Sequence, residues 1–331
     1  MAVARDDAAA ATGPAAGPEL PSDASSPRQI PVRGWLRLLR RVAGHVLGDR
    51  LMVQSAAVAF FAVLSIAPVL VTALAVYSAV NEPEQARAQL SGVLEMLPSD
   101  LASVVAGQLD TITAASGDVL TWRGVTGLVL SLYTATTAMV YLIDGLTLAY
   151  RETETRSFWR RSGLALVFVL GGVLLLGAVI AGAGIGSRAL PDAPPVVRTL
   201  APVATWVVLA LLMGCVLAVL YRFGPDRAQA SWRWISDGAA IATALWLGTT
   251  IGLFAYVQRL GSYEATYGSL AGVAISMLWL WISVFLVIVG AAVNAEAERQ
   301  TVRDSTVGPQ QPLGERGAVV ADSAPPYPDE G

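Results

Sequence analysis

The chain has 331 residues, of which 54% are hydrophobic and only 14% are charged. Soluble domains carry about 25% charged residues, so this composition excludes an ordinary soluble protein and indicates one whose solvent is lipid. A net charge of −3 argues against a nucleic-acid partner. With one cysteine, Cys215, and one histidine, His45, a Cys/His zinc site is impossible, and we expect no metal and no cofactor.

Six apolar, charge-poor runs fill the middle of the chain, and each reaches the roughly 20 residues that a helix needs to cross a bilayer. The sequence therefore predicts an all-α polytopic membrane bundle over residues 31–300 with six transmembrane helices. The predicted spans cover residues 55–80, 124–150, 162–186, 199–221, 238–258 and 268–294.

The arginines between these runs alternate in density. Seventeen of the 22 lie before the first span, in the second and fourth connections or in the C-terminal tail. The positive-inside rule places these segments in the cytoplasm, so we predict a multi-pass membrane protein with both termini inside.

The remaining segments differ in character. Residues 1–30 and 301–331 are rich in Pro, Ala, Ser and acidic residues and predict disordered cytoplasmic tails. Residues 81–123 predict an external loop of two short amphipathic helices. Residues 31–49 predict an amphipathic helix lying in the membrane interface. Its basic residues are either contacts for anionic lipids or an anchor that sets orientation: Arg33, Arg37, Arg40 and Arg41.

One ionisable residue, Asp144, interrupts the second span. Tyr133, Thr137 and Tyr141 share its helical face, which gives one carboxylate and three hydroxyls in a single stripe. The stripe either lines a hydrophilic path, or serves packing, with Asp144 paired to an interfacial arginine such as Arg151 or Arg222.

Small residues and one proline mark candidate packing or break positions. Pro68 is expected to interrupt the first span, as a kink or as a functional break. Ser276 and Ser283 belong to a small-residue seam of the last span, which ends at Asn294. Glycines crowd the third span and favour close packing of a neighbouring helix over a hinge.

Four segments together resemble the YihY/BrkB family of bacterial inner-membrane proteins. They are SAAVAFFAVLSIAPVL at 55–70, LIDGLTLAYRETETRSFWRR at 142–161, YRFGP at 221–225 and YGSLAGVAISMLWLWISVFLVIVGAAVNAE at 267–296. The resemblance covers residues 33–300 and implies an envelope function. Family members commonly have a glutamate where Ala292 stands here, and Glu296 lies one helical turn further on.

The family was long labelled ribonuclease BN, but this chain has no cluster of metal ligands and no group placed to activate water. We therefore expect no enzyme activity. Two interpretations remain: a transporter or lipid translocase of the cell envelope, or a scaffold that holds partners without transport. Membrane lipids, anionic phospholipids among them, are the expected partners; the pattern leaves the oligomeric state open.

Overall fold

The computed structural model describes residues 26–30, 32–48, 51–80, 122–190, 194–259, 269–301 and 303–323. Within them the chain is helical apart from turns and one isolated bridge between Ala230 and Thr306. The helices are η1 (Pro27–Gln29), α1 (Val32–Gly48), α2 (Leu51–Val80), α5 (Trp122–Ala149), α6 (Phe158–Ala189), α7 (Pro195–Phe223), α8 (Trp232–Arg259), α10 (Ser269–Glu298) and α11 (Val319–Asp322).

Five of these helices are long and apolar enough to cross a membrane: α5, α6, α7, α8 and α10. The described part of α2 meets the same criteria only together with α1, from which it is bent by 63°, so the count is five or six. The helices extend beyond the charge-free runs that marked the predicted spans, because the backbone hydrogen-bond ladder continues into charged end turns such as Glu296 to Glu298.

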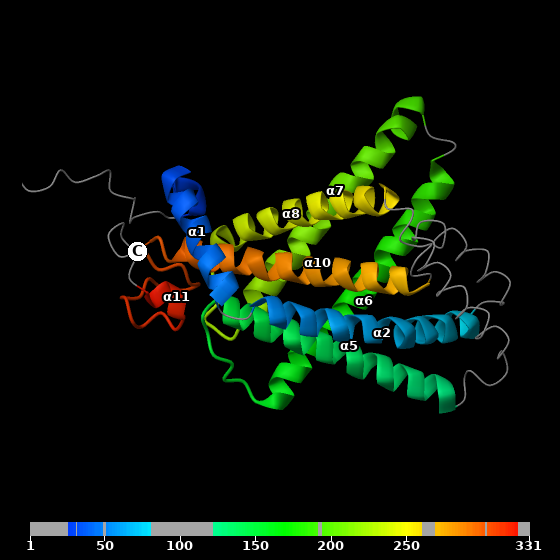
Figure 1. Ribbon diagram of the computed structural model, residues 1–331, viewed down its shortest axis with the longest axis horizontal. Helices are drawn as coiled ribbons and strands as arrows, with labels where there is room; N and C mark the ends of the chain where they lie inside the picture. The colour runs from blue at the N-terminus through cyan, green and yellow to red at the C-terminus, as the bar shows by residue number, and fades with distance from the viewer. Residues whose placement is uncertain are drawn as a thin grey trace, which may run out of the picture.

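The long helices form a bundle in which each packs on its neighbours in the order α6, α5, α2, α10, α8, α7, and α10 also contacts α5 (Figure 1). Helices α1 and α11 lie at the same end of this bundle, which we call the terminal end. Helix α1 crosses that end and packs on α10.

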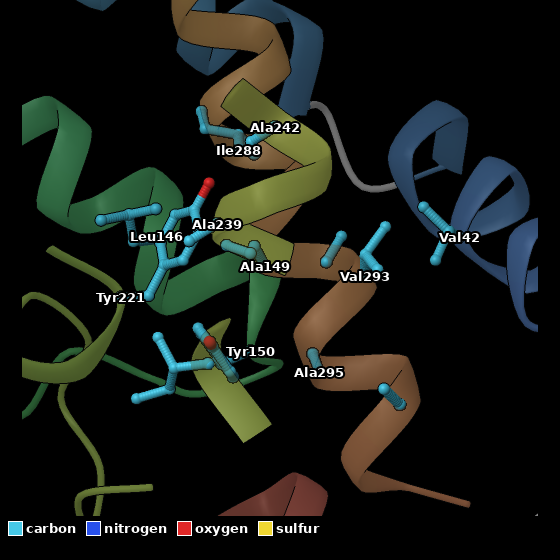
Figure 2. Close-up of a cluster of buried hydrophobic side chains, with 14 of the residues drawn as sticks. Val42, Leu146, Ala149, Tyr150, Tyr221, Ala239, Ala242, Ile288, Val293 and Ala295 are labelled. Atoms are coloured by element: carbon cyan, nitrogen blue, oxygen red, sulfur yellow. The ribbon is translucent and has the colours of Figure 1, made fainter. Parts of the chain in front are cut away.

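The buried core lies toward the terminal end. Figure 2 shows its side chains converging from α1, α5, α7, α8 and α10, with Val42, Leu146, Tyr221, Ala239 and Val293 among them. Many apolar side chains farther from this end remain exposed on α5, α6 and α7, as expected for helices that face lipid.

Helices α8 and α10 touch at backbone distance. The amide of Gly238 donates to Asn294 Oδ1 over 2.8 Å, and Asn294 Nδ2 donates to the Ile235 carbonyl over 3.1 Å. A Cβ atom on Gly238 would stand 2.2 Å from Asn294 Oδ1 and 2.4 Å from the Gly290 carbonyl. This contact therefore requires glycine at 238, and one amide side chain ties the two helices together.

Two expectations from the sequence differ from the structure. A Cβ atom on Gly171, Gly172 or Gly177 of α6 would meet no described residue within 4 Å, so no helix of the described chain packs against these glycines. The C-terminal tail is also not disordered throughout, because residues 303–323 fold against the bundle.

Aspartates and glycines hold this C-terminal segment. Asp322 accepts hydrogen bonds from the amides of Gly314, Arg316 and Gly317, and the Ala228 amide donates to the Gly317 carbonyl. Gly314 and Gly317 have φ of 95° and 69°, where glycine is the favoured residue. Composition missed this segment because hydrogen bonds to Asp322 and tight turns order most of it, while only a short apolar stretch around Val320 is buried in the core.

We predict that Gly238→Ala destabilises the protein by about 1–3 kcal/mol, since the new methyl group displaces Asn294 and the α10 backbone. Gly248→Ala on the same helix is the matched control: its Cβ would meet nothing within 4 Å. That control should be neutral or slightly stabilising. The midpoint of thermal unfolding in detergent measures both, and equal midpoints for the two variants would contradict the α8–α10 contact.

Candidate functional site

The predicted polar stripe lies along α5, and the structure gives its four members different surroundings. Tyr133 is exposed, and Thr137 donates to the Tyr133 carbonyl within the helix over 2.8 Å. The ring of Tyr141 stacks on Phe61 of α2, with centroids 5.3 Å apart. The stripe thus runs from an exposed position to the α2–α5 contact and then to Asp144.

Asp144 is paired with Arg161 of α6, whose Nη1 lies 3.0 Å from Oδ1. The packing interpretation predicted an ion pair with an interfacial arginine, and the structure shows such a pair, but with Arg161 rather than with Arg151 or Arg222, which make other contacts. Arg151 binds Glu296, and Arg222 lies 4.5 Å above the Trp232 ring while donating to the Ala230 carbonyl. About a quarter of each side chain of the Asp144–Arg161 pair stays exposed, at 27% and 25%.

More ion pairs continue from this point into the turn between α5 and α6. Arg156 binds Glu154 at 2.8 Å and lies 3.6 Å from Asp226, and its Nη2 donates to the Gly224 carbonyl. Burial alone would raise the pKa of Asp226, but hydrogen bonds from the Thr155 hydroxyl and amide hold it below the ordinary value. The charged groups thus reach from the loop to Asp144, inside the predicted second span.

A second charged cluster lies where α1 meets α10, centred on Glu296. This carboxylate is fully buried and binds Arg41 of α1 at 3.1 Å, Arg151 at 3.0 Å and Arg299 at 3.2 Å. Arg151 has a φ of 59°, the left-handed conformation that lets the chain turn after α5. Sequence patterns did not indicate this cluster, because Arg41 and Arg151 lie far from Glu296 in the chain.

The neighbouring acidic residue, Glu298, is also buried and binds Arg227 at 2.7 Å. Ser305 of the C-terminal segment donates to the same carboxylate over 2.9 Å. Glu152, in the turn after α5, accepts from the Val319 amide over 2.7 Å. Through these contacts the α7–α8 connection and the C-terminal segment are joined to the end of α10, and the α5–α6 turn is joined to the C-terminal segment.

The predicted packing positions lie mostly on α10. Ser283 accepts a hydrogen bond from Trp246 Nε1 of α8 over 3.0 Å, Asn294 makes the α8 contact described above, and Ser276 is half-buried. Pro68 falls within the helical range of α2, and its side chain lies outside the described residues.

The four basic residues predicted to contact lipid also have different surroundings. Arg37 and Arg40 are exposed, Arg41 is half-buried on Glu296, and the side chain of Arg33 lies outside the described residues. No group of three or more His, Cys, Asp or Glu side chains in the described residues is arranged to hold a metal ion. The His45 ring is buried, with Nε2 3.1 Å from the Ala149 carbonyl.

Residues 42–314 match the model of a family described as Virulence factor BrkB, which confirms the resemblance seen in the sequence. A Bacillus subtilis protein named "Putative ribonuclease-like protein YfkH" is 29% identical over 254 residues, which cover 73% of this chain and 88% of that protein. UPF0761 membrane proteins from Ralstonia nicotianae and Stenotrophomonas maltophilia are 29% and 28% identical over 80% and 75% of this chain. The chain spans 60% and 58% of those two proteins' lengths. No solved structure matches.

We predict that Glu296→Gln destabilises the protein by at least about 2 kcal/mol, because three guanidinium groups lose their shared counter-charge. The loss should stay below that of a fully buried pair, since water reaches the arginines. Thermal unfolding in detergent measures it. The exposed Glu315→Gln is the control and should stay within about 0.5 kcal/mol of wild type. A Glu296→Gln midpoint equal to that of Glu315→Gln would contradict this role.

A pH-dependent prediction concerns Glu152. Burial raises the pKa of this carboxyl, and the Val319 amide and the Arg227 charge only partly oppose the shift. The folded protein therefore binds the proton more tightly than the unfolded one, and the stability contribution of Glu152 falls as the pH rises through its raised pKa.

Glu152→Gln should accordingly be more stable than wild type at neutral pH, by less than about 1 kcal/mol because solvent screens a half-exposed group. The glutamine oxygen still accepts the Val319 hydrogen bond. At about pH 3, more than one unit below the ordinary glutamate pKa, the carboxyl is protonated in both states and the two proteins should unfold together. Unfolding midpoints of both proteins across this pH range measure the stability difference between them. A difference that does not change with pH would contradict a raised pKa of Glu152.

Proposed function

The chain belongs to the Virulence factor BrkB family of membrane proteins, and from this premise we propose that it is a transporter or lipid translocase of the bacterial cytoplasmic membrane. The single observation that carries the proposal is the Asp144–Arg161 ion pair between two spanning helices, of which about a quarter of each side chain is exposed. Ionisable residues within a span are costly to retain and mark substrate or ion paths by default.

The position of this pair supports a path rather than a packing role. Asp144 lies five residues before the end of α5, or about 8 Å along the helix axis. A pair sealed from water can change partners only by exposing an uncompensated buried charge, which costs several kcal/mol. Because both side chains are partly exposed, a charged group of a substrate can replace one of them as the partner of the other.

The groups on either side give such a substrate successive contacts. Toward the α5–α6 turn, Arg156 and its carboxylate partners continue the ionic surface. In the other direction, Tyr141, Thr137 and Tyr133 present hydroxyls along α5. We propose that the guanidinium of Arg161 binds an anionic group, a lipid phosphate or an acidic solute, while Asp144 holds that arginine in place between transport events.

Orientation follows from charge. Both described ends of the chain lie at the terminal end of the bundle, together with most of the arginines. Under the positive-inside rule we assign this end to the cytoplasm.

We propose no enzyme activity. The ribonuclease-like name belongs to the Bacillus subtilis relative. In this chain the one histidine lies buried beside the Ala149 carbonyl, and the basic residues around Glu296 and Glu298 are engaged by those carboxylates.

The test is lipid translocation in proteoliposomes that carry fluorescent phosphatidylglycerol or phosphatidylcholine. We expect protein-dependent movement in wild type and a loss of about tenfold or more in Asp144→Asn and in Arg161→Gln, because each removes a charge-assisted contact. Thr137→Val and Thr205→Val form the matched pair. Both hydroxyls bond the carbonyl four residues earlier in their own helix, but only Thr137 lies on the stripe.

Transport by Thr205→Val should equal wild type, and Thr137→Val should fall below it. Full activity of Asp144→Asn and Arg161→Gln would remove the stripe from the mechanism. Movement of neither lipid above empty vesicles would exclude a lipid translocase and leave acidic solutes, tested by uptake into the same vesicles. Failure of both assays would favour the scaffold.

A further inference from the structure

Helix α1 has more apolar surface than its contact with the bundle uses. One side is buried on the protein, through Leu38, Val42 and Val46, with His45 against the end of α5. The apolar side chains of a surface helix normally end where its packing face ends. Here they do not.

A second apolar side lies next to the buried one. Leu36, Leu39 and Leu47 are 65%, 47% and 72% exposed, and Ala43 between them is exposed as well. At 100° per residue these four positions fall within one arc, adjoining Val46 of the buried face. Three large exposed leucines in one stripe form an apolar surface that no described residue of the chain covers.

The third side of α1 is basic. Arg37 and Arg40 are exposed and form no ion pair with a carboxylate in the described residues. Positions 33, 37 and 40 share an arc with Gly44, beyond Leu47 on the side away from the buried face. Around its axis, α1 therefore passes from protein contact to free apolar surface and then to positive charge.

The position of α1 in the bundle indicates what covers its exposed apolar side and its basic side. Helix α1 is bent by 63° from the first half of α2 and lies across the terminal end of a membrane bundle. A helix in that position meets the boundary between acyl chains and headgroups. Apolar side chains then enter the acyl region, and arginines reach the phosphates beside them.

We propose that Leu36, Leu39 and Leu47 insert into the bilayer boundary and that Arg37 and Arg40 bind the headgroups of anionic phospholipids. Arg41 has no part in this surface, since Glu296 holds it. That ion pair instead fixes the rotation of α1, so that the leucines face lipid. The surface is independent of the proposed transport activity, and its test requires none.

The test uses the full-length protein with Cys215, the one cysteine of the chain, replaced by serine. Single cysteines at Leu39, Leu47 and Gly44 carry a spin label in proteoliposomes of phosphatidylglycerol and phosphatidylcholine. Gly44 is the matched control, because it lies on the basic side of the same helix with nothing within 4 Å of an added Cβ. We expect the labels at 39 and 47 to collide with oxygen and to be shielded from a water-soluble nickel chelate, and the label at 44 to show the reverse.

Nickel access at 39 and 47 equal to that at 44 would show that this side faces water and overturn the proposal. Shielding of these labels from both oxygen and nickel would show that protein covers the stripe, a second copy of the chain for example, and would overturn it as well.

The charge requirement is tested with spin-labelled lipids. Wild type should associate with spin-labelled phosphatidylglycerol more strongly than with spin-labelled phosphatidylcholine. The double variant Arg37→Gln/Arg40→Gln should reduce this preference, by about fivefold for each arginine replaced. Arg303→Gln, exposed in the C-terminal segment, should leave the preference unchanged. An unchanged preference in the double variant would overturn the assignment of anionic headgroups to Arg37 and Arg40.

Discussion

The arrangement of the terminal end of this protein depends on the ion pairs that the buried carboxylate of Glu296 forms with three arginines. It binds guanidinium groups from α1, from the turn after α5 and from Arg299, the residue that follows α10. A buried carboxylate without partners would cost several kcal/mol, so these segments are held in one arrangement. The rotation of α1 follows from it, and with that rotation comes the separation of its buried, apolar and basic sides.

The contact between α8 and α10 supplies a second kind of constraint. Lipid is as apolar as leucine, so apolar side chains gain little by leaving it for another helix. Association then depends on close approach and on hydrogen bonds across the contact. Gly238 provides the approach, and Asn294 and Ser283 provide the bonds. Helix α6 has glycines too, but no described helix packs against them, so small residues alone do not place a helix.

The two charged clusters differ in a way that bears on function. Glu296 and Glu298 are fully buried, and their partners join helices and loops of the terminal end. About a quarter of each side chain of the Asp144–Arg161 pair is exposed, and the pair joins two adjacent helices. A closed network resists rearrangement, whereas an open pair exchanges partners at lower cost. The proposed path therefore lies on the α5–α6 side of the molecule, away from the network that holds α1.

The sequence by itself determined the helical class, the family and the long apolar helices, because lipid requires apolar runs of a definite length with internally satisfied backbones. It also determined that Asp144 is exceptional and that residues 31–49 are amphipathic. Only the tertiary structure decided which arginine Asp144 binds, that Arg41 belongs to Glu296, and that residues 303–323 fold. Ion pairs form between groups that the fold brings within about 4 Å, and their separation in sequence carries no record of that distance.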